Sequence, residues 1–302
     1  MSYRDEAYHL YSGINFTEHS GTDFSKYSLE DLKKLWNATL KQGMHGICFS
    51  MYEDGQQPGD TITEAQVERR IKILKPYTKW IRSFSCIEGN EFVPKMAKKH
   101  GLKTMVGAWL SDDNEKNEEE IEALISLAKN GNVDIAAVGN EVLYRNDLSK
   151  AELLTYIKKV KDALPNIPVG YVDAYYEFTQ HPDIVAATDV ILTNCYPFWE
   201  GCPIEYGQQH MQQMYAQAVG ASQGKPVIIT ETGWPNKGQN VKGSVPSEEA
   251  AMQYFINAIQ WSQVANIPMF YFSSFDESWK IGPEGDVGAH WGLWDKNEKL
   301  KF

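Results

Sequence analysis

The sequence lacks the features of membrane-spanning and nucleic-acid-binding proteins. Its 302 residues contain no run of eighteen apolar residues, so no segment is long enough to cross a bilayer as a helix. The 29 lysines and arginines are outnumbered by 40 aspartates and glutamates, which gives a formal net charge of −11. Because phosphate backbones are bound by basic surfaces, this balance argues against a nucleic-acid partner and favours a neutral substrate.

Metal ligands are also scarce. The four cysteines lie at positions 48, 86, 195 and 202, and their spacing matches no zinc motif. The seven histidines are scattered, and His181 with Asp183 fits the start of a helix better than a metal site. We therefore expect no metal and no cofactor. Cys195 and Cys202 flank a turn, and they either form a disulfide in an exported protein or stay free.

The chain carries no recognisable targeting segment and no internal linker. Its first residues lack the charged and apolar regions of a secretory signal, which leaves two interpretations. The protein is either cytosolic or exported (periplasmic, surface or secreted) after removal of a signal. No stretch rich in proline, glycine or serine divides the chain, and we expect a monomer.

Apolar runs rich in Val, Ile, Phe and Tyr recur through the chain. They are nearly continuous, as is typical of parallel strands that are covered on both faces. Eight such runs are found, near residues 46–52, 80–86, 103–109, 133–141, 167–175, 190–197, 226–232 and 267–276.

Helical patterns separate most of these runs. Capping boxes at 61–64 and 149–152 predict helices to about Lys75 and Leu164, and Ser247 begins another helix to about Asn266. Strands that alternate with helices predict a parallel β/α fold, and eight strands are the number that closes a barrel. An open doubly wound sheet is the alternative, but residues 51–59 lack its phosphate-binding glycine loop.

The sequence therefore predicts a single (β/α)8 TIM barrel over residues 46–302. Residues 1–45 form a short N-terminal helical extension that packs on the barrel. Its helix, near Leu29–Gln42, is expected to cover the region left open by the short tail after strand eight.

Two of the predicted strands end at a glutamate. Glu141 follows an apolar run that begins at Asp134, and Glu231 ends a second run and precedes a Gly-Trp-Pro turn. In a barrel of this class both side chains point into the mouth at the carboxyl ends of the strands. A pair of carboxylates presented in this way suits the cleavage of glycosidic bonds. The alternative is that each glutamate caps its strand or pairs with a surface lysine.

Aromatic residues with a polar edge are abundant. The chain has nine tryptophans and sixteen tyrosines, which suit the faces of sugar rings. Many of them serve core packing instead, as expected for Trp36 and Trp261 inside helical patterns. Further polar and aromatic residues fall at strand ends or just past them, namely Asn140, Tyr196, Trp199, Trp234, Asp276, Glu277 and Trp279.

Several of these segments resemble glycoside hydrolase family 17, the β-1,3-glucanases and related glucanosyltransferases. The run Val227–Asn236 is similar to the nucleophile segment of that family, and Gly139–Val142 is similar to its acid/base segment. Segments 194–198, 275–280 and 290–294 resemble its sixth and eighth strand endings, and the likeness covers roughly residues 46–302.

This resemblance implies a retaining hydrolase that cleaves β-1,3-glucan of the laminarin type, with endo action. Glu141 becomes the acid/base and Glu231 the nucleophile. Asn140 is expected to bind the sugar 2-hydroxyl, and Arg82 to orient a glutamate. Tyr196 either hydrogen-bonds to Glu231 or packs before a proline turn.

Other residues are expected to contact the substrate. Glu277 and Lys280 either hold sugar hydroxyls or form an ion pair, and Trp234 is expected to pack under the nucleophile. The remaining predicted substrate-binding residues are Tyr52, Trp199, Trp279 and Trp294.

Three other functions were weighed against this one. A β-1,3-glucanosyltransferase uses the same two glutamates and differs only in the acceptor. A catalytically inactive glucan-binding barrel is disfavoured because both glutamates are present. A Schiff-base aldolase needs a lysine at the inner end of a strand, and none of the eight runs ends in one.

Overall fold

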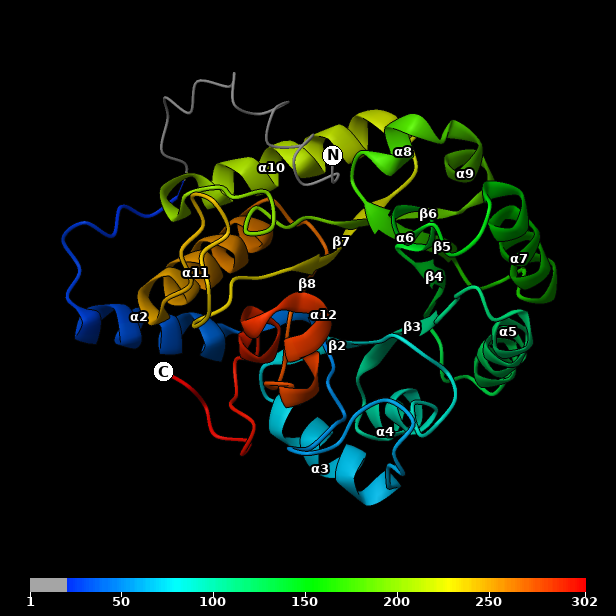
Figure 1. Cartoon of the computed structure of the whole chain (residues 1–302), viewed down its shortest axis with the longest axis horizontal. Helices are drawn as coiled ribbons and strands as arrows, with labels where there is room; N and C mark the ends of the chain where they lie inside the picture. The colour runs from blue at the N-terminus through cyan, green and yellow to red at the C-terminus, as the bar shows by residue number, and fades with distance from the viewer. Residues whose placement is uncertain (1–20) are drawn as a thin grey trace.

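Eight parallel strands close into a barrel surrounded by helices. The computed structural model describes residues 21–302, and in it each strand pairs with the next while β8 pairs with β1 (Figure 1). The strands are β1 Met44–Cys48, β2 Thr78–Ser83, β3 Lys103–Ala108, β4 Ile135–Asn140, β5 Val169–Ala174, β6 Val190–Asn194, β7 Val227–Thr232 and β8 Met269–Tyr271. The predicted TIM barrel is confirmed.

The strands form where the sequence is most continuously apolar. β4, β6 and β7 are buried along their whole length, because the barrel interior covers one face and helices cover the other. Strand β8 has only three residues, although the prediction ran to 276, because the chain leaves the ladder after Tyr271. Phe275 instead forms a bridge with Trp294.

Helices follow most of the strands on the outside of the barrel. Ser149 and Glu152 form the predicted capping box, and Ser247 caps its helix through Ala250 N. The box predicted at Thr61 is wrong, since Thr63 is the residue that caps that helix. The longer helices are α2 Leu29–Gln42, α3 Glu64–Leu74, α4 Phe92–Lys99, α5 Asn114–Lys129, α7 Lys150–Ala163, α10 Ile204–Ala221 and α11 Glu248–Val264.

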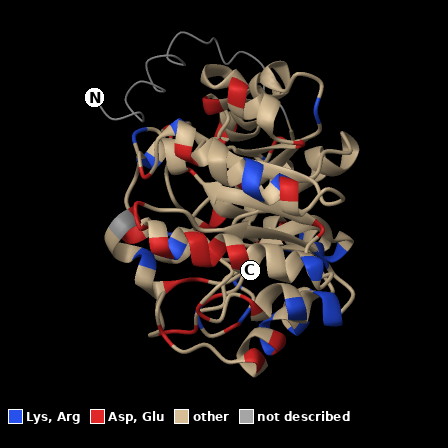
Figure 2. Ribbon diagram, turned by 90° about the vertical axis from the view of Figure 1, so that its right-hand side faces the viewer, with Lys and Arg blue, Asp and Glu red and all other residues tan. Residues whose placement is uncertain are grey.

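Short helices occupy the connections. They are α6 Val142–Arg145, α8 Glu177–Gln180, α9 Pro182–Ala187, η1 Ser278–Lys280, α12 Ile281–Glu284 and η2 Asp286–His290. Figure 2 shows the acidic and basic residues mainly on the helices and loops of the ribbon. Among residues 21–302, no helix is both long and apolar enough to span a membrane.

Helix α2 lies beside α11 and covers the side of the barrel that the last part of the chain forms (Figure 1). Its Trp36 is fully buried, and the indole ring lies 5.3 Å from the ring of Phe255 and 5.2 Å from that of Phe302. The described chain after β8 contains only short helices, so α2 supplies the cover that a final long helix would give. Residues 1–20 of the predicted extension lie outside the described residues.

Candidate active site

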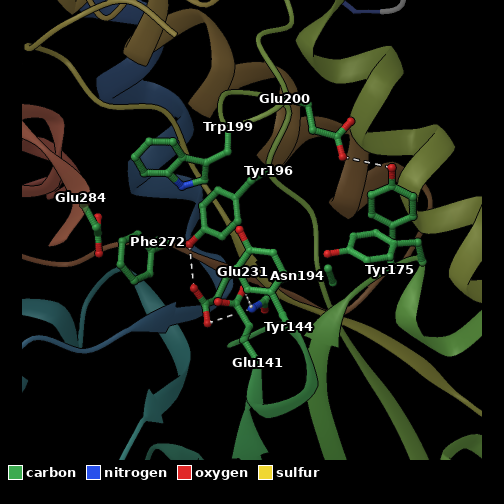
Figure 3. Close-up of a pocket in the computed structure, with 12 residues that line it drawn as sticks. Glu141, Tyr144, Tyr175, Asn194, Tyr196, Trp199, Glu200, Glu231, Phe272 and Glu284 are labelled. Carbon is green, nitrogen blue, oxygen red and sulfur yellow. Dashed lines mark hydrogen bonds between the residues drawn. The ribbon is translucent and has the colours of Figure 1, made fainter. Parts of the chain in front are cut away.

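Two cavities meet at the carboxyl ends of the strands. The larger, with a volume of about 650 Å³, is lined by residues that follow β1, β2, β3 and β8. The smaller, of about 190 Å³, is lined mainly by residues that follow β4, β5 and β6 (Figure 3). Both cavities are bordered by the same four residues, Glu141, Glu231, Phe272 and Glu284. The predicted glutamate pair therefore stands where the two halves of one groove join.

Glu231 lies within β7, and its carboxylate is surrounded by donors. Arg82 Nη1 lies 2.8 Å from Glu231 Oε1, and the Tyr196 hydroxyl donates to Oε2 over 2.7 Å. Asn194 Nδ2 donates to Oε1 over 3.2 Å. These contacts fix the orientation of the carboxylate and offset its charge. Tyr196 thus takes the hydrogen-bonding alternative of the two predicted for it.

Glu141 follows β4 on a left-handed turn. Its φ angle is 53°, and Gly139, two residues earlier, has a φ angle of 82°, which glycine adopts without strain. The Glu141 amide donates to Val172 O on β5 over 2.7 Å, which anchors the turn. Burial and then the neighbouring charge of Glu231 raise the pKa of Glu141 to about 7.

A single amide nitrogen bridges the two glutamates. Asn194 Nδ2 lies 2.9 Å from Glu141 Oε1 and 3.2 Å from Glu231 Oε1, so these oxygens are no further apart than the sum of the two distances (Figure 3). That sum is smaller than the roughly 6.5–9.5 Å between the carboxyls of inverting glycosidases. Thr230 Oγ1 donates to Asn194 Oδ1 over 2.8 Å, which turns the amide NH2 group toward both carboxyls.

Asn194 is the residue that sequence reasoning missed. It lies in the segment 194–198 that resembles the family, and it ends β6 just as Asn140 ends β4. Its position at a strand end was the signal that the sequence offered. Its pairing with Glu231 in the ladder could not be predicted, because the β6–β7 register shifts between Thr193 and Asn194.

Arg82 connects Glu231 to Asn140. Its Nη2 donates to Asn140 Oδ1 over 2.8 Å, while its guanidinium lies 4.1 Å from the centre of the Phe84 ring. Only 2% of the Arg82 side chain is exposed. A buried cation so held orients the end of β4 and the end of β7 together.

Three of the predicted residues after β8, Glu277, Trp279 and Lys280, line the larger cavity. Lys280 Nζ lies 2.8 Å from Glu277 Oε2, so the predicted ion pair is present. Trp279 Nε1 donates to Glu277 Oε1 over 3.3 Å, and the ring of Tyr52 lies 5.7 Å from that of Trp279. Burial lowers the pKa of Lys280, but the negative charges of Glu277, Glu284 and Glu231 together raise it above its ordinary value.

The remaining tryptophans divide between the site and the core. Trp199 lines the smaller cavity, and Trp234 is buried against Phe198, with its ring 5.2 Å away. Trp294 does not reach either cavity, which corrects its predicted substrate contact. Its backbone amide donates to Ser274 O, and its ring lies 5.5 Å from that of Tyr77, at the start of β2 and thus away from the mouth.

The cysteines do not take part in a bridge or a metal site. All four are buried and free, so the disulfide alternative for Cys195 and Cys202 is not what the structure contains. Within residues 21–302, no group of His, Cys, Asp and Glu side chains is arranged to hold a metal ion.

Comparison with known proteins identifies the family. Residues 46–292 match the family described as the BtgE/BtgC glycoside hydrolase domain. The chain belongs to this glycoside hydrolase family. The expected relation to family 17 is confirmed as well, since the chain is 33% identical to a glycoside hydrolase family 17 β-1,3-glucanosyltransferase from Rhizomucor miehei. That structure aligns with a TM-score of 0.77 over 86% of this chain and 96% of the other.

Curated relatives agree with this assignment. The chain is 30% identical to a glucan 1,3-beta-glucosidase of Arthroderma benhamiae, over 81% of this chain and 85% of the relative. It is 26% identical to the glucan 1,3-beta-glucosidase of Saccharomyces cerevisiae, over 81% of this chain and 86% of the relative. An endo-laminarinase from Formosa shares the fold at 18% identity, with a TM-score of 0.74 over 91% of this chain and 87% of the other.

Proposed function

We propose that this glycoside hydrolase cleaves β-1,3-glucan with retention of anomeric configuration, using Glu231 as nucleophile and Glu141 as acid/base. The observation that carries the proposal is the Asn194 amide shared by both carboxyls, because it holds them closer than inverting chemistry needs. The names of the relatives support the substrate class.

In the first step Glu231 attacks the anomeric carbon while Glu141 transfers its proton to the departing glycosidic oxygen. The bond from carbon to the leaving oxygen breaks, and an ester bond to Glu231 forms. Glu141 is ready as an acid because its pKa is raised to about 7 by burial and by the charge of Glu231.

In the second step the same groups exchange functions. Once Glu231 is esterified its negative charge is gone, so the pKa of Glu141 falls and its carboxylate becomes a base. Glu141 then removes a proton from a water molecule, whose oxygen attacks the anomeric carbon and releases Glu231. The product keeps the β configuration.

The larger cavity takes the glycone part of the chain in this proposal. Asn140, Glu277 and Lys280 line it beside Glu231, and the buried Arg82 holds Asn140. Because Asn140 Oδ1 accepts from Arg82, the amide NH2 of Asn140 is the end that donates to the sugar 2-hydroxyl. The smaller cavity takes the leaving part, and its aromatic side chains offer faces for a sugar ring.

Transfer to a second sugar is the other candidate function. It is favoured by the family 17 relative described as a glucanosyltransferase. The smaller cavity, lined by Tyr144, Tyr175, Tyr176 and Trp199, suits an acceptor sugar as well as a leaving one. Incubation with concentrated laminari-oligosaccharide decides between them, since oligomers longer than the input form only by transfer.

The substrate is tested by digestion of laminarin, curdlan, lichenan and cellulose, with products resolved by size. Cleavage of laminarin and curdlan but not cellulose is expected, and the Glu231→Gln variant serves as the blank. Wild-type preference for cellulose would overturn the β-1,3 assignment.

A further inference from the structure

Trp109 stands apart from the other tryptophans. It follows β3 directly, and with 40% of its surface exposed it is the most exposed of the nine tryptophans, all of which the structure describes. Its side chain lines the larger cavity. An indole at the wall of a cavity offers a flat apolar face and a polar edge, which suits contact with a ligand.

The indole of Trp109 packs against an arginine. The guanidinium of Arg145 covers one face, with its central carbon 4.4 Å from the ring centre. Arg145 is itself fixed, because its Nη2 donates to Leu110 O over 3.1 Å, its Nε donates to Asp147 over 2.7 Å, and its Nη1 donates to Asn140 O. Trp109 is therefore held in a fixed position, and the Arg145 side chain links it to the segment that carries Asn140 and Glu141.

Polar groups suited to sugar hydroxyls line the same cavity. Lys116 Nζ and Glu88 Oε1 lie 3.4 Å apart, and both side chains are exposed. Ser83 is buried at the end of β2, and its hydroxyl has no hydrogen-bond partner within the described part of the chain. A flat apolar face with donors and acceptors around it matches a glucopyranose ring.

We propose that Trp109, supported by Arg145, is the stacking platform of a distal glycone subsite for a glucosyl unit of the β-1,3-glucan chain. The inference rests on the proposed function and adds a chain-length preference to it. Substrates that reach the platform are processed faster than those that end before it.

The test measures kcat/KM over the series from laminaritriose to laminariheptaose. Trp109→Ala is expected to lower kcat/KM about tenfold for the longest oligomers and little for the shortest ones that are cleaved. Trp109→Phe keeps a ring and retains most of the long-chain advantage. Trp261→Ala removes an indole on α11 that does not line either cavity, and it leaves the length dependence unchanged.

Two results would overturn the subsite. An equal loss at every length, or no loss at any length, shows that Trp109 does not bind the distal sugar. Titration calorimetry then measures the affinity of the same oligomers for two proteins, the Glu231→Gln variant and the double variant that also carries Trp109→Ala. If the wild-type protein cleaves no oligomer, the proposed function fails, while the calorimetry still supports or rejects the subsite by its dependence on Trp109.

A buried tyrosine holds the turn that carries Glu141. The Tyr171 hydroxyl accepts a hydrogen bond from Leu143 N over 2.9 Å, at the start of α6, and donates its own proton to Asp173. Both side chains are buried, at 1% and 0% exposure. Tyr171 Cε2 would also lie 3.5 Å from a Cβ placed on Gly139.

The geometry points to Tyr171 as a positioning residue for Glu141, with Asp173 orienting the Tyr171 hydroxyl. The hydroxyl fixes the chain two residues after Glu141, and Gly139 lies against the same ring two residues before it. Without the hydroxyl, Leu143 N loses its buried partner and the turn relaxes. The proton of Glu141 then no longer aligns with the leaving oxygen.

Leaving-group dependence tests this role. Tyr171→Phe is expected to lower kcat/KM about tenfold on laminari-oligosaccharides and much less on a 2,4-dinitrophenyl β-laminarioligoside, whose leaving group needs no proton. Tyr254→Phe deletes another buried hydroxyl, which contacts Thr232, and its effect is the same on both substrates. Asp173→Asn keeps an acceptor for Tyr171 and retains most of the activity.

An equal loss on both substrates for Tyr171→Phe would overturn the positioning role. Unfolding midpoints of the variants accompany the kinetics, so that a folding defect is recognised. If Tyr171→Phe does not fold, Tyr171→Trp and Asp173→Ala are compared on the same two substrates. Failure of the unmodified protein on both substrates would instead count against the proposed function.

Discussion

Arg82 and Glu231 form an ion pair inside the mouth of the barrel, with Nη1 2.8 Å from Oε1 and the two side chains only 2% and 8% exposed. The same guanidinium donates to Asn140. A buried pair of this kind costs desolvation, so its value lies in geometry rather than in stability. It holds the proposed nucleophile in one orientation relative to the end of β4.

Arg82→Lys is therefore expected to be far from conservative. Lysine keeps the charge but cannot donate to Glu231 and Asn140 at once with fixed geometry. We expect kcat/KM on laminarin to fall about a hundredfold, and Arg82→Ala to lower the free energy of unfolding by about 3–5 kcal/mol. Arg69→Lys, in an exposed ion pair with Glu298, is the matched control and changes neither quantity much. Near wild-type kinetics for Arg82→Lys would contradict the account.

The pH dependence follows from Glu141. Burial and the charge of Glu231 raise its pKa to about 7, and the proton must be present for the first step. kcat/KM should thus decline as pH rises through about 7. The free energy of unfolding should also decline as pH rises from the ordinary glutamate pKa to about 7, because the folded state binds this proton more tightly than the unfolded state does. Glu141→Gln should abolish both trends. A profile that stays flat to pH ~9 would count against Glu141 as the acid.

Asn194 offers a second probe of the same electrostatics. Asn194→Asp places a carboxylate beside both glutamates, which raises the pKa of Glu141 further and moves the alkaline limb to higher pH. Asn194→Ala removes the shared donor, whose hydrogen bond lowers the pKa of Glu141. We therefore expect kcat to fall about a hundredfold and the limb to move to higher pH, by less than in Asn194→Asp. Full pH profiles of kcat/KM for both variants make the comparison. Limbs unchanged from the wild type in both variants would show that Asn194 does not act on Glu141.

Trp36 tests the cover that α2 gives to the barrel. Its indole is fully buried against Phe255 and Phe302 and lies far from the cavities. Trp36→Ala is expected to lower the free energy of unfolding by about 3–5 kcal/mol, as measured with denaturant, and to leave kcat nearly unchanged at low temperature. A variant with wild-type stability would mean that α2 is dispensable for the fold.

Sequence reasoning located the features that depend on strand order. Glu141 and Glu231 were predicted to share one mouth because parallel strands deliver their carboxyl ends to one side of a barrel. Arg82 contacts a glutamate, Glu231, as predicted, and Tyr196 adopts the hydrogen-bonding one of its two predicted alternatives. Such contacts follow from topology, which the spacing of apolar runs indicates well.

Features that depend on local register were less accessible. Asn194 meets both glutamates only through the shift in the β6–β7 ladder, and Trp294 is carried away from the mouth by its bridge with Phe275. The cap at Thr63 rather than Thr61 has a similar cause, since both threonines offer a hydroxyl and the backbone angles decide which one is used. Trp109 lies in no recognisable motif, so its proposed contact with the substrate could be inferred only from its place in the cavity and its packing against Arg145.

Trapping the glycosyl-enzyme is the most direct test of Glu231 as the nucleophile. A 2,4-dinitrophenyl 2-deoxy-2-fluoro-β-laminarioligoside slows the second step more than it slows the first, and mass spectrometry of the digested protein then locates the label. We expect one fluorinated glycosyl group attached to Glu231, and no label in the Glu231→Gln variant. A label on another residue, or prompt turnover with the α-anomer as first product, would contradict it.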